Sequence, residues 1–299
     1  MVKNTSPKIQ EIDTNVKAEM RMLDTSHSNV LDNAYGLVME PAPIMKAASF
    51  GVPNRAPEHR ILYMKHGSMR LSVNFMDYSL LQGDILTIPA NFIISINHLS
   101  HDAQPWLLAF RFDVPEEQSL VGIEPMNPSP DINEQRMIED YFRLMREALT
   151  RPIPNKDDFR HLVLSLLYRV QKLHALTTGH AQGDMGSRAK QIKSEFINLV
   201  VSQEPPIRSI SFYADRLKVT SNYLSIIIKQ ETKRTVMDWV EDKIDALIKM
   251  LLASPQNLTL EQIAEHCGYT TGNQVSRFFK NRNGITPAEY RKSVAPTSN

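Results

Sequence analysis

The chain has 299 residues, with 34 Lys and Arg against 33 Asp and Glu, for a formal net charge of +1. This length allows two domains, and the single cysteine excludes an internal disulfide and a cysteine-based zinc cluster. The N-terminus lacks the apolar run of a signal peptide, and no stretch is long and apolar enough to span a bilayer. We therefore expect a cytoplasmic protein without a membrane partner.

The charge is unevenly distributed along the chain. Residues 188–299 hold 16 Lys and Arg and 11 Asp and Glu, whereas residues 1–187 hold 18 and 22. A basic end joined to an acidic end is typical of a DNA-binding domain attached to a sensor domain. Because the basic excess is modest, nonspecific DNA binding should be moderate and salt-sensitive.

Residues 1–30 are polar and weakly patterned, and we expect an N-terminal arm there. Short apolar runs separated by turn signals follow. They predict strands at 60–65, 69–75, 84–89, 92–96 and 106–112, with turns at 66–68, 82–84 and 89–91. Many short strands at this spacing predict a cupin-like β-barrel or jelly roll.

The run 81–89 resembles the turn-and-strand element of cupins, whose enzymes hold a metal through histidines. In the matching register the histidine position falls on Ile94, in an apolar strand. The histidines of this region lack the paired His-x-His spacing: they are His59, His66, His98 and His101. We expect the last two in a polar loop, and we expect no metal site, no cofactor and no catalytic residue.

A largely apolar pocket for a small effector is one expectation for the barrel, since eight-stranded barrels can hold one small ligand. Arg60, Arg70 or Arg111 would then anchor a carboxylate or phosphate; the alternative is that they are surface arginines on alternating strands. A filled barrel that serves only dimerisation or a partner protein is a further alternative.

From about residue 131 to 176 the pattern becomes helical, with Pro152 and Pro154 between two helices. The first apolar stripe is Met137, Tyr141, Leu144, Met145 and Ala148, and the second is Phe159, Leu162, Val163, Leu166, Leu167, Val170 and Leu173. Residues 177–187 contain three glycines and no periodic apolar pattern, which predicts an interdomain linker.

The last third contains one helix-turn-helix pattern twice, at Ser209–Lys233 and Thr259–Gly284. The paired positions are Ala214/Ala264, Leu217/Cys267, Leu224/Val275, Ser225/Ser276, Ile228/Phe279 and Lys229/Lys280. The spacing changes from 50 to 51 residues in the turn, where an insertion is tolerated. Two copies in register favour a protein that reads two adjacent stretches of the DNA major groove over ordinary helical hairpins.

Each part of the repeat has a physical role. The two alanines are small because helices cross closely there, and Leu217, Leu224, Cys267 and Val275 fill the small core. Gly268 follows a helix end, where a left-handed residue satisfies the last carbonyls. The good N-cap residues before the second helices are Thr220, Ser221, Thr270 and Thr271.

The region from Lys190 to Lys292 resembles the DNA-binding domain of AraC/XylS-type transcription regulators. The resemblance rests on Ile263–Tyr269, Ser276–Lys280 and Gly284–Arg291, and the first two thirds of the chain match only in general plan. It implies a helical connector over 235–253 that holds two reading helices about one DNA turn, roughly 34 Å, apart. It also implies promoter DNA and RNA polymerase as partners, and a homodimer paired through the helices after the barrel; the alternative is that these helices only cover the barrel.

The family pattern assigns base reading to Asn222, Ser225, Ile226, Asn273 and Arg277, and phosphate contacts to Thr220, Lys229, Thr271 and Lys280. Asparagine pairs with adenine and arginine with guanine through two hydrogen bonds each. Four residues depart from the family's usual ones: Ile226 and Lys243 replace arginines, Val275 a phenylalanine and Lys233 a glycine. We therefore expect the second helix-turn-helix to carry more of the specificity.

The sequence predicts an α+β protein with two domains, a cupin-like domain at 31–176 and an all-α double helix-turn-helix domain at 188–292, followed by a tail at 293–299. The expected function is sequence-specific, DNA-binding transcription regulation controlled by a small effector or partner. The alternatives are a cupin-type metal enzyme fused to a DNA-binding domain and a regulator controlled only by a partner protein.

Overall fold

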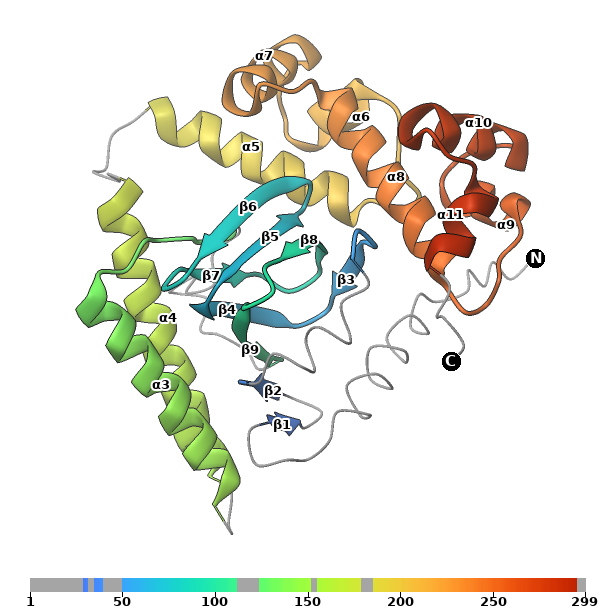
Figure 1. Cartoon of the computed structure of the whole chain (residues 1–299). Helices are drawn as coiled ribbons and strands as arrows, with labels where there is room; N and C mark the ends of the chain where they lie inside the picture. Colours follow the sequence, from blue (N-terminus) through green and yellow to red (C-terminus); the bar gives the residue numbers. More distant parts are fainter. Residues whose placement is uncertain are drawn as a thin grey trace, which may run out of the picture.

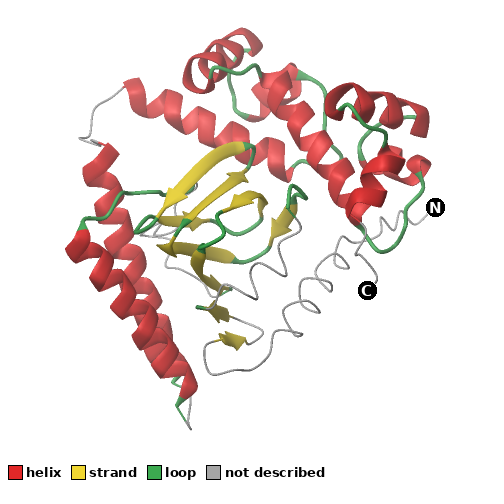
Figure 2. Ribbon diagram, viewed as in Figure 1, coloured by secondary structure: helices red, strands yellow, loops and turns green. Residues whose placement is uncertain are grey.

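The computed structural model describes residues 29–31, 35–39, 50–111, 124–151, 155–178 and 185–294. A β-rich N-terminal part is followed by a helical C-terminal part (Figures 1 and 2). Most of the predicted arm at 1–30 and the tail from 295 onward lie outside the described residues.

The described strands of the N-terminal part form two antiparallel sheets. The first has the order β1 (Asn29–Leu31), β2 (Tyr35–Val38), β9 (Gln104–Phe110), β4 (His59–His66) and β7 (Ile85–Ile88). The second has the order β3 (Asn54–Ala56), β8 (Phe92–Leu99), β5 (Ser68–Val73) and β6 (Met76–Leu81). The predicted double-sheet domain is thus confirmed.

Strand β4, which lies between β9 and β7, is buried on both faces. Leu62 and Met64 pack in the core between the two sheets, whereas Ile61 and Tyr63 pack against the helices on the other side. A strand covered on both faces reads as a continuous apolar run, which is why it was visible in the sequence. The sequence does not predict β6, because Leu80 is the one buried residue of this strand and no alternation of apolar and polar residues results.

Helices α3 (Ile132–Thr150) and α4 (Lys156–Thr178) cover the outer face of the five-stranded sheet. The predicted stripe of α4 is confirmed, with Phe159, Val163, Leu166, Leu167 and Val170 buried. The stripe predicted for α3 is partly wrong. Its buried face is Ile138, Phe142, Met145, Ala148 and Leu149, while Met137 and Leu144 are 41% and 48% exposed.

The predicted linker at 177–187 is flanked by helices. α4 continues to Thr178, and α5 (Met185–Ser202) begins before the predicted end of the linker. Residues 179–184 lie outside the described residues, so the linker boundaries stay a prediction.

The C-terminal part consists of α5 and six further helices. They are α6 (Ile210–Arg216), α7 (Ser221–Thr232), α8 (Val236–Ala253), α9 (Leu260–His266), α10 (Gly272–Asn283) and α11 (Pro287–Val294). α8 is the predicted connector, and it is largely buried, with Trp239 and Ile244 among its fully buried side chains. It begins with a capping box formed by Thr235 and Asp238. It ends at Ala253, and its C-cap Ser254 directly precedes Pro255, as expected.

The two parts of the chain contact each other directly. Arg55 of β3 donates to the Val201 carbonyl at 3.1 Å and pairs with Glu204 at 2.8 Å. Lys243 of α8, whose side chain is fully buried, donates to the same two acceptors at 2.8 and 3.3 Å. Burial lowers the pKa of the Lys243 ammonium to about 8; the Arg55 charge acts in the same direction and Glu204 opposes it. The N-terminal part and the connector thus share two acceptors, the Val201 carbonyl and the Glu204 carboxylate.

Within the described parts of the chain, no helix combines the length and apolar character that crossing a membrane requires.

Candidate DNA interface

The two helix-turn-helix units have the predicted small cores. Ala214 and Ala264 are buried, and so are Leu224, Cys267 and Val275. In the second unit α9 and α10 approach so closely that a Cβ at Gly272 would lie 2.8 Å from the Leu260 Cβ. The small residues therefore permit the close crossing that sets the angle of α10.

Threonines cap α7 and α10, the two helices that the sequence predicts to read DNA. The Thr220 hydroxyl accepts from the Tyr223 amide at 3.2 Å, and the Thr271 hydroxyl accepts from the Gln274 amide at 3.4 Å. Each threonine is the N-cap of its helix, as expected. The N-terminus of each helix carries a partial positive charge suited to a phosphate.

Backbone positions with positive φ distinguish the two units. Gly268 and Gly284 have φ of 70° and 75°, and the corresponding residues of the first unit, Lys218 and Lys233, have φ of 55° and 59°. Lys233 is the left-handed C-cap of α7, as Gly284 is of α10. The first unit therefore accepts backbone strain at two places and carries two exposed lysines there.

The assigned base-reading residues lie at the surface, with one exception. Asn222, Ile226, Asn273 and Arg277 are exposed on α7 or α10. Ser225 is partly buried, and its hydroxyl donates to the Ser221 carbonyl at 2.8 Å, so its hydrogen is not available to a base. Lys229 and Lys280, assigned to phosphates, are exposed as well.

Tyr223 is a candidate that the sequence reasoning missed. Its side chain is 46% exposed, and Ile226, three residues later, is 45% exposed. Residues three apart share a helix face, so the exposed face of α7 is apolar beside Asn222. The tyrosine could have been found by extending the exposed stripe one turn back from Ile226.

The three N-terminal arginines do not gather at one site. Arg60 and Arg111 both pair with Glu58, at 3.4 and 2.8 Å, while Arg70 is exposed on β5. Burial raises the pKa of Glu58, but the two arginines outweigh it and hold this pKa below its ordinary value. Glu58 therefore already compensates two of the three charges assigned to an effector.

The expected position of a cupin metal ligand lies in the core. Ile94 is buried between the sheets, and no group of three or more His, Cys, Asp or Glu suited to a metal occurs in the described ranges. His101 lies in a turn, but the expectation of a loop was wrong for His98, which belongs to β8.

Residues 213–293 match the family described as helix-turn-helix domain. The C-terminal part of the chain is an AraC-type helix-turn-helix domain. The matched residues run from α6 to α11 and include α7 and α10. The two antiparallel sheets of the N-terminal part lie outside the matched residues.

Among solved structures of similar proteins, some align with most of this chain and others only with its C-terminal part. ToxT from Vibrio cholerae O395 is 12% identical, with 89% of this chain and 100% of that chain covered and a TM-score of 0.44. The C-terminal domain of the response regulator yesN from Fusobacterium nucleatum is 28% identical, covers 35% of this chain and 98% of that chain, and has a TM-score of 0.31. No curated protein matches the sequence.

Proposed function

We propose that this protein regulates transcription by binding promoter DNA through α7 and α10, with α10 as the principal reading helix. The observation that carries this proposal is the pair of threonine-capped, exposed helices on either side of one buried connector. α10 offers Asn273 and Arg277, the side-chain types that pair with adenine and guanine. α7 offers Asn222 beside an apolar face suited to a thymine methyl group.

The proposal is tested by selecting an operator with the full-length protein and measuring the affinity of variants for it. Arg277→Ala should weaken binding by about 5- to 150-fold, because one bidentate base contact contributes about 1–3 kcal/mol. Asn222→Ala should lose less. Lys172→Ala, at an exposed lysine on α4, is the control and should bind like the unmodified protein.

Two results would contradict this assignment. Absence of salt-dependent binding to every duplex would overturn DNA binding itself. A larger loss from Asn222→Ala than from Arg277→Ala would make α7 the principal reading helix.

The N-terminal part is proposed to control this binding in response to a small effector or a partner protein. What supports control from this part is the contact of Arg55 with Val201 and Glu204, the same two residues that accept from Lys243 of the connector. Arg60, Arg70 and Arg111 stay candidates for binding an anionic effector. Because Arg60 and Arg111 pair with Glu58, such a ligand must either displace Glu58 from these two arginines or share them with it. Isothermal titration with carboxylate and phosphate ligands, repeated on Arg70→Ala, tests this: an unchanged affinity removes Arg70 from the site.

The proposed function also carries proposals for the partners, the location and the oligomeric state of the protein. The proposed partners are promoter DNA and RNA polymerase, and the proposed location is the cytoplasm. Met137, Tyr141 and Leu144 form a partly exposed apolar stripe along α3, and we assign it to a homodimer interface between two copies of this helix.

A further inference from the structure

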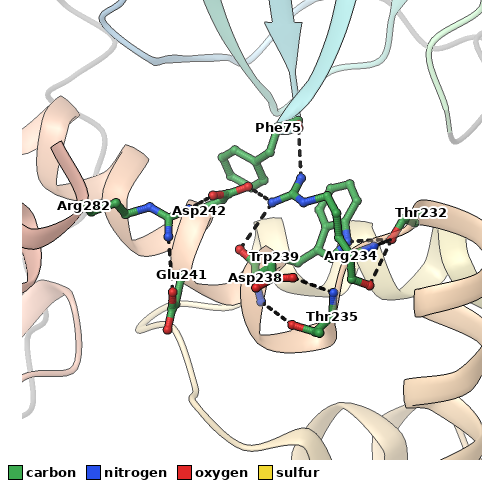
Figure 3. A network of polar contacts seen from close by, with 9 residues as sticks. All are labelled: Phe75, Thr232, Arg234, Thr235, Asp238, Trp239, Glu241, Asp242 and Arg282. Carbon is green, nitrogen blue, oxygen red and sulfur yellow. Dashed lines mark hydrogen bonds and ion pairs between the residues drawn. The ribbon is translucent and has the colours of Figure 1, made fainter.

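A polar cluster joins the two helix-turn-helix units at α8. The two carboxylate oxygens of Asp242 accept from two different arginines, Oδ2 from Arg234 and Oδ1 from Arg282 (Figure 3). Arg282 also pairs with Glu241 at 3.2 Å. The Asp242 side chain is 19% exposed, which is less than any of the three side chains around it, those of Arg234, Glu241 and Arg282. The carboxylate is therefore largely enclosed by its partners.

The two arginines come from opposite units. Arg234 follows directly after the C-cap of α7, whereas Arg282 lies in the last turn of α10. Asp242 thus ties the C-terminal ends of both reading helices to one point on the connector. Because each charged hydrogen bond is directional, this arrangement restrains the orientation of α7 relative to α10.

Arg234 is held in place by further contacts. Its guanidinium lies 4.4 Å from the ring centre of the buried Trp239 and donates to the Asp238 carbonyl at 3.4 Å. The Trp239 indole in turn donates to the Thr232 hydroxyl at 3.2 Å. An arginine stacked on a buried ring is pre-organised for its partners, so Arg234 has little freedom to release Asp242 by rotation.

The N-terminal part reaches the same cluster. The carbonyl of Phe75, in the turn between β5 and β6, accepts from Arg234 at 3.2 Å, and its ring lies edge-on to Trp239 at 6.4 Å (Figure 3). Phe75 has φ of 67° and the preceding Asn74 has φ of 45°. A bulky residue rarely adopts this conformation. The buried Asn74 side chain maintains the turn by accepting from the Ile93 amide at 2.8 Å.

We propose that Asp242 and Arg234 are positioning residues that set the relative orientation of the two reading helices, and that the β5–β6 turn conveys the state of the N-terminal part to them through Phe75. This inference rests on the proposed DNA-binding function. Orientation of the helices determines which separation between two half-sites fits the protein. The preferred spacing of an operator is therefore the property that the cluster controls.

The test compares duplexes that carry both half-sites, at the selected spacing and at one base pair more or less, with a duplex that carries only the α10 half-site. The unmodified protein should bind the selected spacing best. Asp242→Asn should lose about 3- to 30-fold there, the range of a residue that couples two sites. It should discriminate less between spacings and bind the single half-site normally. Asp242→Glu, which keeps the carboxylate, should keep much of the preference for the selected spacing.

The matched control is Glu147→Gln, which removes the carboxylate charge of an exposed ion pair with Arg151 on α3. It should leave both affinity and spacing preference unchanged. If Asp242→Asn lowers the melting temperature markedly, Arg282→Lys provides the same comparison, since a lysine keeps the charge but cannot contact Glu241 and Asp242 together.

The role of the N-terminal part is tested with Phe75→Gly, which suits the positive φ and removes the ring. It should also flatten the spacing preference, because the Phe75 ring packs against Trp239, the ring that holds the Arg234 guanidinium. Its effect should not add to that of Asp242→Asn, since Asp242 is a partner of the same arginine. Full additivity, or an unchanged preference, would overturn the connection through Phe75.

Failure of the inference is distinguishable from failure of the proposed function. No duplex binding by the unmodified protein would overturn DNA binding itself. Normal binding together with an unaltered spacing preference in Asp242→Asn would overturn the positioning role alone. An equal loss by Asp242→Asn on one and on two half-sites would likewise overturn it.

Discussion

At the scale of the residue, Cys267 reports on the core of the second helix-turn-helix unit. It is the single cysteine of the chain, it is fully buried, and burial raises the pKa of its thiol to about 12. A thiol that is both buried and protonated reacts only when its surroundings open. Labelling of the protein therefore measures opening of the core between α9 and α10 without any engineered probe.

We expect a thiol reagent to modify the native protein more than about a hundredfold more slowly than the chain unfolded in denaturant, because modification requires local opening. The measurement is the rate of colour release by an aromatic disulfide at pH 8. Cys267→Ala should give no signal, which confirms its source. Equal rates in native and unfolded protein would mean that the thiol is accessible.

Single residues also mark the limit of prediction from sequence. The caps at Thr220 and Thr271 could be predicted because each acts within its own helix turn. The pairing of Arg60 and Arg111 with one glutamate could not, because it depends on β4 lying beside β9 with His59 opposite Phe110. Local signals identify a residue's role when its partner is near in sequence.

At the scale of the element, α7 and α10 end in the same geometry with different residues. Both C-caps are left-handed, with Lys233 after α7 and Gly284 after α10. Glycine adopts this conformation freely, whereas a residue with a Cβ is strained there. No atom lies within 4 Å of a Cβ built at Gly284, so a substitution there tests the backbone cost without a steric clash.

We expect Lys233→Gly to stabilise the protein and Gly284→Ala to destabilise it, each by about 1 kcal/mol, because the left-handed conformation costs a non-glycine residue about that much. The free energy of unfolding in urea measures both changes. Lys172→Ala, at an exposed position within α4, serves as a control expected to change little. Shifts of both cap variants in the same direction would contradict this account.

The helix α3 shows why the phase of an element is harder to predict than its presence. Its apolar residues occupy two faces, and the sequence pattern alone did not say which one meets the sheet. Tyr63 and Trp106 of the sheet contact Phe142, and this packing places Met137 and Leu144 outward. The partner surface, supplied by distant strands, decides the orientation.

At the scale of the whole molecule, the outward face of α3 predicts self-association. An exposed apolar stripe favours contact with another surface, and two copies of one helix can pair about a twofold axis. Leu144→Glu should convert a dimer at micromolar concentration into a monomer, measured by sedimentation velocity, without loss of helical content. Leu81→Glu, at an exposed site on β6, is the control. A monomeric unmodified protein would rule this dimer out.

The arrangement of the two parts is likewise a property of the whole molecule. Arg55 of β3 contacts α5 and the loop before α6. Phe75, in the turn between β5 and β6, contacts Arg234 and Trp239 of the connector region. Each contact joins residues more than a hundred positions apart. A change in the N-terminal part therefore has two physical routes to the helices that we propose to read DNA.

The sequence by itself determined the helix-turn-helix units, because periodic apolar positions, small crossing residues and caps all act over a few residues. It also determined the double-sheet class, through short strands and turns. Only the tertiary structure decided which face of α3 is buried, which residues pair with Arg60 and Arg111, and how Phe75 meets Arg234. These features depend on the docking of distant segments, which no local pattern encodes.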